Sequence, residues 1–202
     1  MYEAESLKST AEKITGLARP SARQLDRAAS KVRPSVYRFK DNYLVPDNPQ
    51  LPLVVYCGAV RLFRNCDPAS IFEDLFERNG WADGWSNGIY DYVHFHPRIH
   101  EVLGIARGSG TVQFGGSTGR KVKLKAGDVA ILPAETGHQL LHGSDNLLVV
   151  GAYPAQGKYM ECAPTVAEHA QALKAIPNVP LPSQDPVFGK GGPLLKLWSE
   201  AS

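Results

Sequence analysis

Cysteine is scarce in this chain, and its spacing excludes two common uses of cysteine. The three cysteines, Cys57, Cys66 and Cys162, form no C-x-x-C pair, and their number is odd. We therefore expect neither a disulfide framework nor a cysteine-based structural zinc site. The first residues, MYEAESLKST, also lack the apolar core of a secretion signal. Together these absences predict a reduced, cytoplasmic protein.

Long hydrophobic runs and a large charge excess are absent as well. No apolar run approaches the roughly 18 residues of a membrane-spanning helix, so we expect no membrane partner. The net charge is only +2, from 22 basic and 20 acidic residues, which argues against nucleic acid as a partner. What remains is an ordinary globular composition with 43% hydrophobic residues, and a chain of this length buries about 70% of its unfolded surface.

The 202 residues divide into three regions that differ in their residue pattern. Residues 1–35 form a predicted N-terminal helical arm of two weakly periodic pieces separated by Pro20. The arm is basic, and we interpret it as a solvated or partner-docked element. Residues 36–155 predict a β-rich domain. Residues 156–202 hold a predicted helix at 165–176, with Thr165 as its cap and Val166, Ala170 and Leu173 facing inward, and a Pro- and Gly-rich tail with apolar anchors, wrapped over that domain.

The middle region is predicted to be nearly all β. One helix near residues 68–78 interrupts it, with Asp67 as its N-cap and Asn79 and Gly80 at its end. Seven or more short strands with short loops favour a closed barrel or a sandwich over a parallel α/β sheet. The predicted strands are 52–58, 89–96, 101–107, 111–115, 120–125, 128–133, 138–142 and 146–153, with 60–63 extending or pairing with the first.

Histidine clustering is the most informative feature, since five of the six histidines lie between residues 94 and 142. His94 and His96 share one face of a predicted strand. Glu101 opens the next strand, and His138 begins a later one. Three imidazoles and one carboxylate suit one divalent transition metal: iron, manganese, nickel, copper, cobalt or zinc. An octahedral ion would keep about two positions open for water, substrate or dioxygen.

These residues resemble the two sequence motifs of the cupin superfamily. The second motif, at residues 127–142, departs from the family pattern at Glu135, where the family has glycine, and at His142, where it has asparagine. More narrowly, residues 37–198 look like the YjlB-like single-domain cupins, whose biochemical role is unassigned. The first motif is matched at every position, by Gly88, His94, His96, Glu101 and Gly108 at the family's spacing.

The resemblance implies an all-β fold, the double-stranded β-helix or jelly-roll barrel of cupins, here with a few flanking helices. It also implies that His94, His96, Glu101 and His138 are the metal ligands. Cupin barrels commonly dimerise through sheet edges or swapped strands, so a homodimer is the expected assembly. The alternative for the four ligands is a hydrogen-bonded polar interior without metal.

Strand parity supplies further candidates. Tyr90 and Tyr92 share parity with His94, and His142 shares it with His138, so these three are the candidate proton-transfer residues. Gln113, in a neighbouring strand, is the candidate substrate-pocket residue. For each of them structural packing remains an open alternative. Two other histidines are expected outside the site: His100 as a structural or surface residue and His169 on the surface.

We expect a metal-dependent enzyme that acts on a small polar molecule held in the barrel. Dioxygenase-type chemistry and isomerase- or decarboxylase-type chemistry both suit an open metal site, and the residues do not choose between them. The alternative is a non-catalytic small-molecule or metal binder, a sensor or accessory protein. Arg98 and Arg107 would bind an anionic substrate only if they face the interior.

Overall fold

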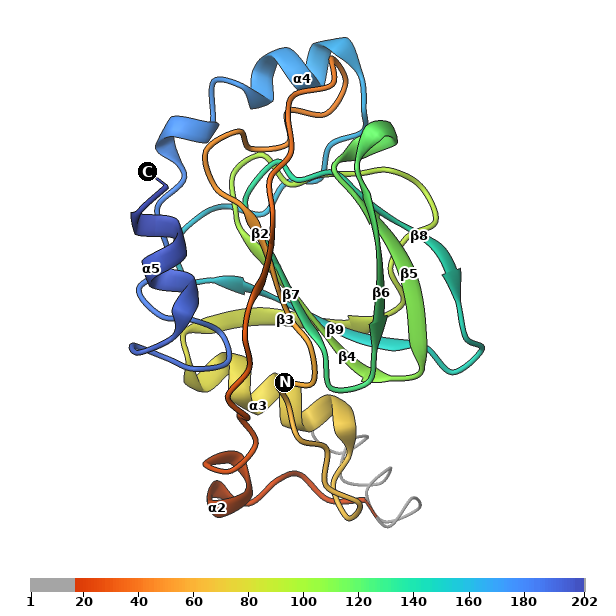
Figure 1. Ribbon diagram of the computed structural model, residues 1–202, viewed down its shortest axis with the longest axis vertical. Helices are drawn as coiled ribbons and strands as arrows, with labels where there is room; N and C mark the ends of the chain where they lie inside the picture. The colour runs from red at the N-terminus through yellow and green to blue at the C-terminus, as the bar shows by residue number, and fades with distance from the viewer. Residues whose placement is uncertain (1–16, 202) are drawn as a thin grey trace, which may run out of the picture.

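Two antiparallel sheets face each other and form the centre of the molecule (Figure 1). In the computed structural model of the chain, residues 17–201 are described, so the helix expected in the first half of the arm lies outside the described residues. The three-stranded sheet has the order β6 (Arg120–Lys125), β5 (Ser109–Phe114), β8 (His138–Gly143). The six-stranded sheet has the order β1 (Ser35–Tyr37), β2 (Leu53–Tyr56), β7 (Val129–Leu132), β4 (Glu101–Arg107), β9 (Leu148–Pro154), β3 (Trp81–Asn87).

Both faces of the six-stranded sheet are covered, which explains why its central strands are continuous apolar runs. All four residues of β2 and of β7 are buried. One face, with Val54 and Ile131, packs against α3 (Pro68–Arg78) and α5 (Pro193–Ser199). The other face, with Val55 and Leu103, packs against the three-stranded sheet and forms the barrel interior. The jelly-roll expectation is confirmed, although the hydrogen-bonded ladders of residues 17–201 do not run without interruption around the barrel.

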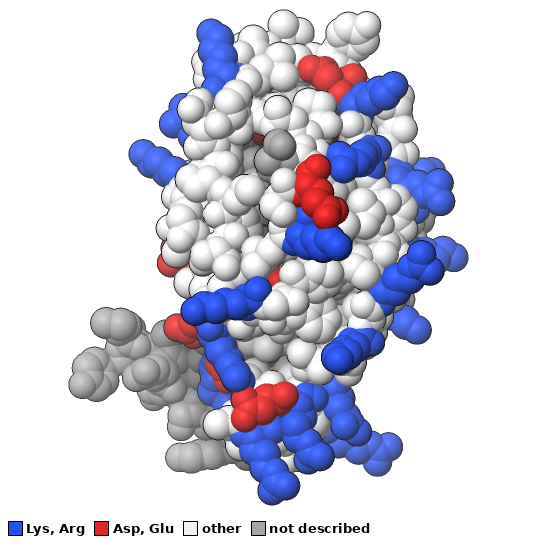
Figure 2. All heavy atoms as spheres, turned by 60° about the vertical axis from the view of Figure 1, so that its left-hand side comes forward, with Lys and Arg blue, Asp and Glu red and all other residues white. Residues whose placement is uncertain are grey.

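The short helices cover the outside of this double layer. α3 begins and ends as predicted, because the Asp67 side chain accepts a hydrogen bond from Ser70 N and Asn79 is the C-cap residue. α2 (Ala22–Leu25) starts at a capping box of Ser21 and Gln24. In the view of Figure 2, Lys and Arg side chains gather at the lower end of the molecule, which is the end that carries α2 in Figure 1. No helix within residues 17–201 is long and apolar enough to cross a membrane.

The C-terminal tail is tied to the six-stranded sheet by one buried carboxylate. Asp185 is fully buried, and its Oδ2 accepts a hydrogen bond from the Tyr56 hydroxyl at 2.6 Å. Trp198, at the end of α5, is 1% exposed and donates from Nε1 to Pro52 O at 2.9 Å. Asp185 further accepts from three backbone N–H groups of the tail: Val187 at 2.8 Å, Phe188 at 3.0 Å and Leu194 at 3.2 Å.

Several elements differ from the sequence prediction. Residues 60–63 form no strand, since Val60 makes only an isolated bridge to Ala29. Residues 89–96 are not a regular strand either, because the chain bends at residues 91–92 and forms only isolated bridges, at His94 and Phe95. β3 is a strand that the apolar pattern did not reveal, since as an edge strand it is mostly exposed and has a polar sequence.

The predicted helix at 165–176 is shorter and more exposed than its pattern suggests. α4 spans Val166–Ala172, and Thr165 caps it by accepting a hydrogen bond from Glu168 N, as expected. Val166 and Leu173, predicted to face inward, are 73% and 41% exposed, and Ala172 is buried instead. The prediction of the helix face was therefore wrong: α4 lies on the rim of the molecule and packs through its C-terminal end (Figure 1).

Candidate metal centre

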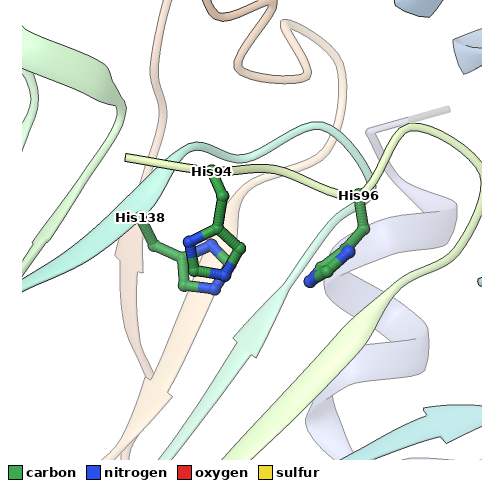
Figure 3. Close-up of side chains that lie close together, drawn as sticks. All are labelled: His94, His96 and His138. Atoms are coloured by element: carbon green, nitrogen blue, oxygen red, sulfur yellow. The ribbon is translucent and has the colours of Figure 1, made fainter. Parts of the chain in front are cut away.

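Three histidines come together where the segment before β4 meets the start of β8 (Figure 3). One ring nitrogen of each of His94, His96 and His138 lies within 4.8 Å of the others, and all three side chains are buried. The backbone builds the cluster, since His94 N donates to His138 O at 3.2 Å and His138 N donates to His94 O at 3.0 Å. The spacing of two between His94 and His96 therefore does bring both rings to one place, although the strand around them is irregular.

The Nδ1 atom of each of the three rings is hydrogen-bonded to a backbone carbonyl oxygen. A carbonyl oxygen only accepts, so each Nδ1 carries a proton, and in a neutral ring Nε2 then offers a free lone pair. Outer partners of this kind orient histidine ligands of metals. The partners of Nδ1 are Tyr92 O at 3.3 Å for His94, Met160 O at 2.9 Å for His96 and Thr136 O at 3.2 Å for His138.

Glu101 completes the cluster with a buried carboxylate. Its Oε2 lies 3.5 Å from His96 Nε2 and 3.3 Å from His138 Nε2, and the residue is 2% exposed. Burial raises the pKa of Glu101, but the imidazoles of His96, His138 and His94 together outweigh it and bring the pKa to about 2. Burial, followed by the other two rings, lowers the pKa of His94 to about 3. At neutral pH Glu101 is therefore ionised and the imidazole of His94 is neutral.

This donor set fits a metal ion. The Oε2 atom of Glu101 is buried and receives no hydrogen bond from the described part of the chain. Nε2 of His96 and Nε2 of His138 lie 3.5 and 3.3 Å from it. In neutral rings both of these nitrogens are acceptors, and acceptors that face one another repel unless a cation or protons lie between them. Three imidazole nitrogens and one carboxylate oxygen are a first-row transition-metal ligand set.

A cavity of about 460 Å³ opens from the cluster. Tyr90 lines it, as predicted, while Tyr92 does not, although its ring stacks on that of Tyr90 with centroids 4.8 Å apart. Tyr159 and Glu161, from the segment after β9, also line the cavity. These last two residues were missed because the irregular segment 155–162 carries no sequence pattern that places it beside the histidines.

Tyr153 is a further residue of the cavity wall that the sequence analysis missed. In the β4–β9 register, Val102 pairs with Ala152, so Tyr153 lies opposite Glu101. Its hydroxyl accepts a hydrogen bond from Trp85 Nε1 at 2.9 Å. Burial first, and then the charge of Glu101, raise the pKa of the Tyr153 phenol, which keeps its proton at neutral pH. Only the strand order β4–β9 identifies this neighbour, and that order is not a local sequence signal.

Two sequence candidates are not brought to the cavity. The alternation that would turn His142 inward is broken by a β-bulge, because Thr111 pairs with His142 while Val112 pairs with Leu140. His142 is exposed and lines a separate depression. Gln113 is engaged elsewhere: its Nε2 donates to the carbonyl oxygens of residues 116 and 117 at 2.7 and 3.1 Å and so holds the β5–β6 turn.

The remaining histidines and the two arginines lie outside the cavity. His100 is fully buried, accepts a hydrogen bond from Ala134 N at 2.9 Å and so has the expected structural role. His169 is less exposed than expected, with its side chain 14% exposed and Nε2 2.8 Å from an Asp41 carboxylate oxygen. Arg107 is paired with Asp67 at 2.9 Å, and Arg98 is exposed beside another depression.

The turn before His138 contains an unusual buried glutamate. Glu135 stands where the cupin motif has glycine, and its φ of 74° lies in the left-handed region that favours glycine. The residue is fully buried, and neither carboxylate oxygen has a hydrogen-bond partner among the residues that the structure describes. Burial, with a smaller contribution from Asp41, raises the pKa of Glu135 to about 9. The family turn is thus retained at a cost in backbone strain and desolvation.

Replacing Glu135 with glycine is expected to raise the free energy of unfolding by about 1 kcal/mol or more. A non-glycine residue in this conformation costs of order 1–3 kcal/mol, which exceeds the loss of about 0.5–1 kcal/mol from a more flexible unfolded chain. Urea unfolding at neutral pH measures the change. Asp83→Gly is the control, since Asp83 also has positive φ but is exposed, and its gain should be smaller. A destabilised Glu135→Gly protein would mean that the glutamate holds the turn together.

Comparison with known proteins supports the cupin resemblance. No family model matches the chain. The chain is 36% identical over 162 residues to the uncharacterized protein YjlB of Bacillus subtilis (strain 168), a match that covers 80% of this chain and 94% of that protein.

Solved structures are more distant. Oxalate decarboxylase from Bacillus subtilis is 19% identical with a TM-score of 0.31, over 55% of this chain and 22% of that one. Acireductone dioxygenase from Bacillus anthracis, with a cadmium ion in its active centre, is 20% identical with a TM-score of 0.31, over 43% and 59%. The chain thus spans about a fifth of the decarboxylase. From the YjlB match, the two facing sheets and the motif residues gathered at one site, we conclude that the chain belongs to the YjlB-like cupins.

Proposed function

We propose that this protein is a metal-dependent enzyme in which His94, His96, Glu101 and His138 hold one divalent transition metal. The observation that supports the proposal is the orphaned, buried Oε2 of Glu101, which faces the Nε2 atoms of His96 and His138 at 3.5 and 3.3 Å. The cavity of about 460 Å³ beside this cluster is large enough for a small polar substrate.

A metal in this position would supply Lewis-acid polarisation of a carbonyl or a redox centre for oxygen chemistry. The protein's own residues bind and orient the substrate and handle protons. Tyr153 keeps a phenol proton next to Glu101, and Trp85 fixes the orientation of that phenol through a hydrogen bond of 2.9 Å. Tyr90 lines the cavity and is a second candidate proton donor, whereas His142 is too exposed and remote for that role.

Elemental mass spectrometry tests the metal site. Untagged protein that has never been exposed to a chelator is expected to contain about one metal ion per chain. His94→Ala and His138→Ala should lose it, because each removes a buried imidazole of the cluster. His142→Ala is the matched control and should keep it, since His142 is exposed outside the cluster. Wild-type protein that binds no metal even after reconstitution would contradict the proposal.

The identity of the metal selects the chemistry to assay. Bound iron, manganese, nickel or copper directs the search to oxygen-dependent reactions of the dioxygenase type, whereas zinc directs it to isomerase- or decarboxylase-type reactions. Zinc would need a second preparation from zinc-poor medium, because zinc readily replaces other metals at histidine sites.

We also propose a homodimer, as the resemblance to cupins implies. The arm at 1–35 and the tail within 156–202 are the proposed dimer elements, although both also contribute to the fold, since Ala28 and Leu194 are fully buried in the core. Light scattering at micromolar concentration is expected to give twice the mass of the 22.0 kDa chain. A monomeric mass would contradict the assembly and leave the metal site unaffected.

A further inference from the structure

Acidic side chains line the cavity beside the histidine cluster. Asp83, Glu101 and Glu161 line it, and no lysine or arginine of residues 17–201 does. Arg107 and Arg98, the arginines nearest in sequence, lie outside it. A divalent cation bound by Glu101 carries a net charge of +1, and the two other carboxylates more than balance it. The cavity therefore disfavours an anionic substrate and attracts a cationic one.

Aromatic rings lie around the Glu161 carboxylate at the outer part of this cavity. The Tyr90 and Tyr92 rings are stacked with centroids 4.8 Å apart, and Tyr159 lies 5.1 Å from the His96 ring. Tyr90, Tyr92 and Tyr159 are 47%, 48% and 53% exposed, so their rings remain accessible to a ligand. Large aromatic side chains left half exposed around a pocket are typical of a binding site.

Glu161 is held in place between two of these rings. Its Oε1 accepts a hydrogen bond from the Tyr92 hydroxyl at 3.3 Å, and its Oε2 accepts one from the Tyr159 hydroxyl at 3.2 Å. The carboxylate is thus fixed at the cavity, and no lysine or arginine of residues 17–201 lines the cavity beside it. The charge of Glu161 attracts an ammonium group, and the half-exposed rings of Tyr92 and Tyr159 beside it add a cation–π attraction where the group reaches a ring face.

We propose that the substrate carries an ammonium group that docks against Glu161 between Tyr92 and Tyr159. Its other, polar end points to the histidine cluster, where the buried Oε2 of Glu101 has no hydrogen-bond partner in the described residues. The assignment of the polar end rests on the proposed function, whereas the ammonium site depends only on the tyrosines and Glu161.

A set of three probes of nearly equal shape tests the ammonium site. Choline is cationic, 3,3-dimethylbutan-1-ol is its neutral isostere, and 3,3-dimethylbutanoate is anionic. In calorimetric titration of the full chain, choline is expected to bind at least about tenfold more tightly than either of the others, a typical gain for a cation among aromatic rings and a carboxylate. Added salt should weaken the binding of choline and leave that of the neutral alcohol unchanged.

Two variants test whether Glu161 is responsible for the preference for choline. Glu161→Gln should weaken choline binding about tenfold and leave the metal content and the binding of the neutral alcohol unchanged. Glu77→Gln removes the same charge from the exposed face of α3, outside the cavity, and should change nothing. Equal affinity for all three probes, no saturable choline binding at millimolar concentration, or an unaltered Glu161→Gln protein would each overturn the inference.

These experiments distinguish a failure of the ammonium site from a failure of the metal-enzyme proposal. Protein with a full metal complement but no preference for choline would overturn the ammonium site and leave the metal enzyme proposal intact. Protein without metal that still prefers choline would support the ammonium site and overturn the proposed function. His138→Ala, which should lack metal, is therefore titrated alongside and is expected to keep the preference for choline over its neutral isostere.

Discussion

Replacing Glu101 with alanine is expected to weaken metal binding by at least about a hundredfold. Loss of a residue that only supports a metal ligand already costs about 10–100-fold in affinity, and Glu101 offers its own oxygen to the cluster. The oxygen lies 3.5 and 3.3 Å from Nε2 of His96 and His138, so no other described carboxylate of the cavity is as well placed. Competition of the protein with a chromophoric chelator for Co²⁺ or Zn²⁺ measures the loss.

Two further variants separate charge from mere proximity. Glu101→Gln keeps the shape and one carbonyl oxygen but loses the negative charge, so its affinity should fall between those of the wild type and Glu101→Ala. Tyr153→Phe removes the phenol beside Glu101 and leaves the carboxylate in place, so its effect should be smaller than that of Glu101→Ala. Wild-type affinity in Glu101→Ala would show that the three histidines hold the metal alone.

Replacing Asp185 with alanine is expected to lower the free energy of unfolding by about 3–5 kcal/mol. The change leaves the buried Tyr56 hydroxyl and three backbone N–H groups without an acceptor, and each buried donor left unpaired costs about 1–3 kcal/mol before any relaxation. The tail should then separate from the sheet, because Asp185 joins Tyr56 in β2 to the turn that precedes α5. Urea unfolding and limited proteolysis of the tail measure the two effects.

Asp145→Ala is the matched control, since Asp145 is an exposed aspartate between β8 and β9 and its loss should leave stability within about 0.5 kcal/mol of the wild type. Asp185→Asn should be intermediate, because one acceptor oxygen remains while an amide N–H₂ group takes the place of the other. Equal stability of Asp185→Ala and Asp145→Ala would mean that the tail is held by its apolar anchors alone.

Local sequence signals were sufficient for several elements of the fold. The bounds of α3 follow from Asp67, Pro68 and Asn79, since caps act through hydrogen bonds to neighbouring residues. β6 was predicted with its observed bounds, because Val122 and Leu124 alternate with exposed lysines in a strand that has one face in the core. Histidine spacing likewise predicted the cluster, because its members are brought together by a single short contact between two segments.

Long-range pairing decided the rest. His142 turns outward because one bulge in β8 shifts the alternation, and a bulge depends on the partner strand β5. Tyr153 lies beside Glu101 because β9 pairs with β4, and Glu161 reaches the cavity because an irregular segment folds back over it.

The sequence by itself therefore determined the family, the strands with strong local patterns and the histidine cluster, since each depends on residue types at short spacing. Only the tertiary structure decided the walls of the cavity and their charge. Those walls are assembled from β3, β9 and the segment after β9, whose side chains meet through contacts that no local pattern encodes.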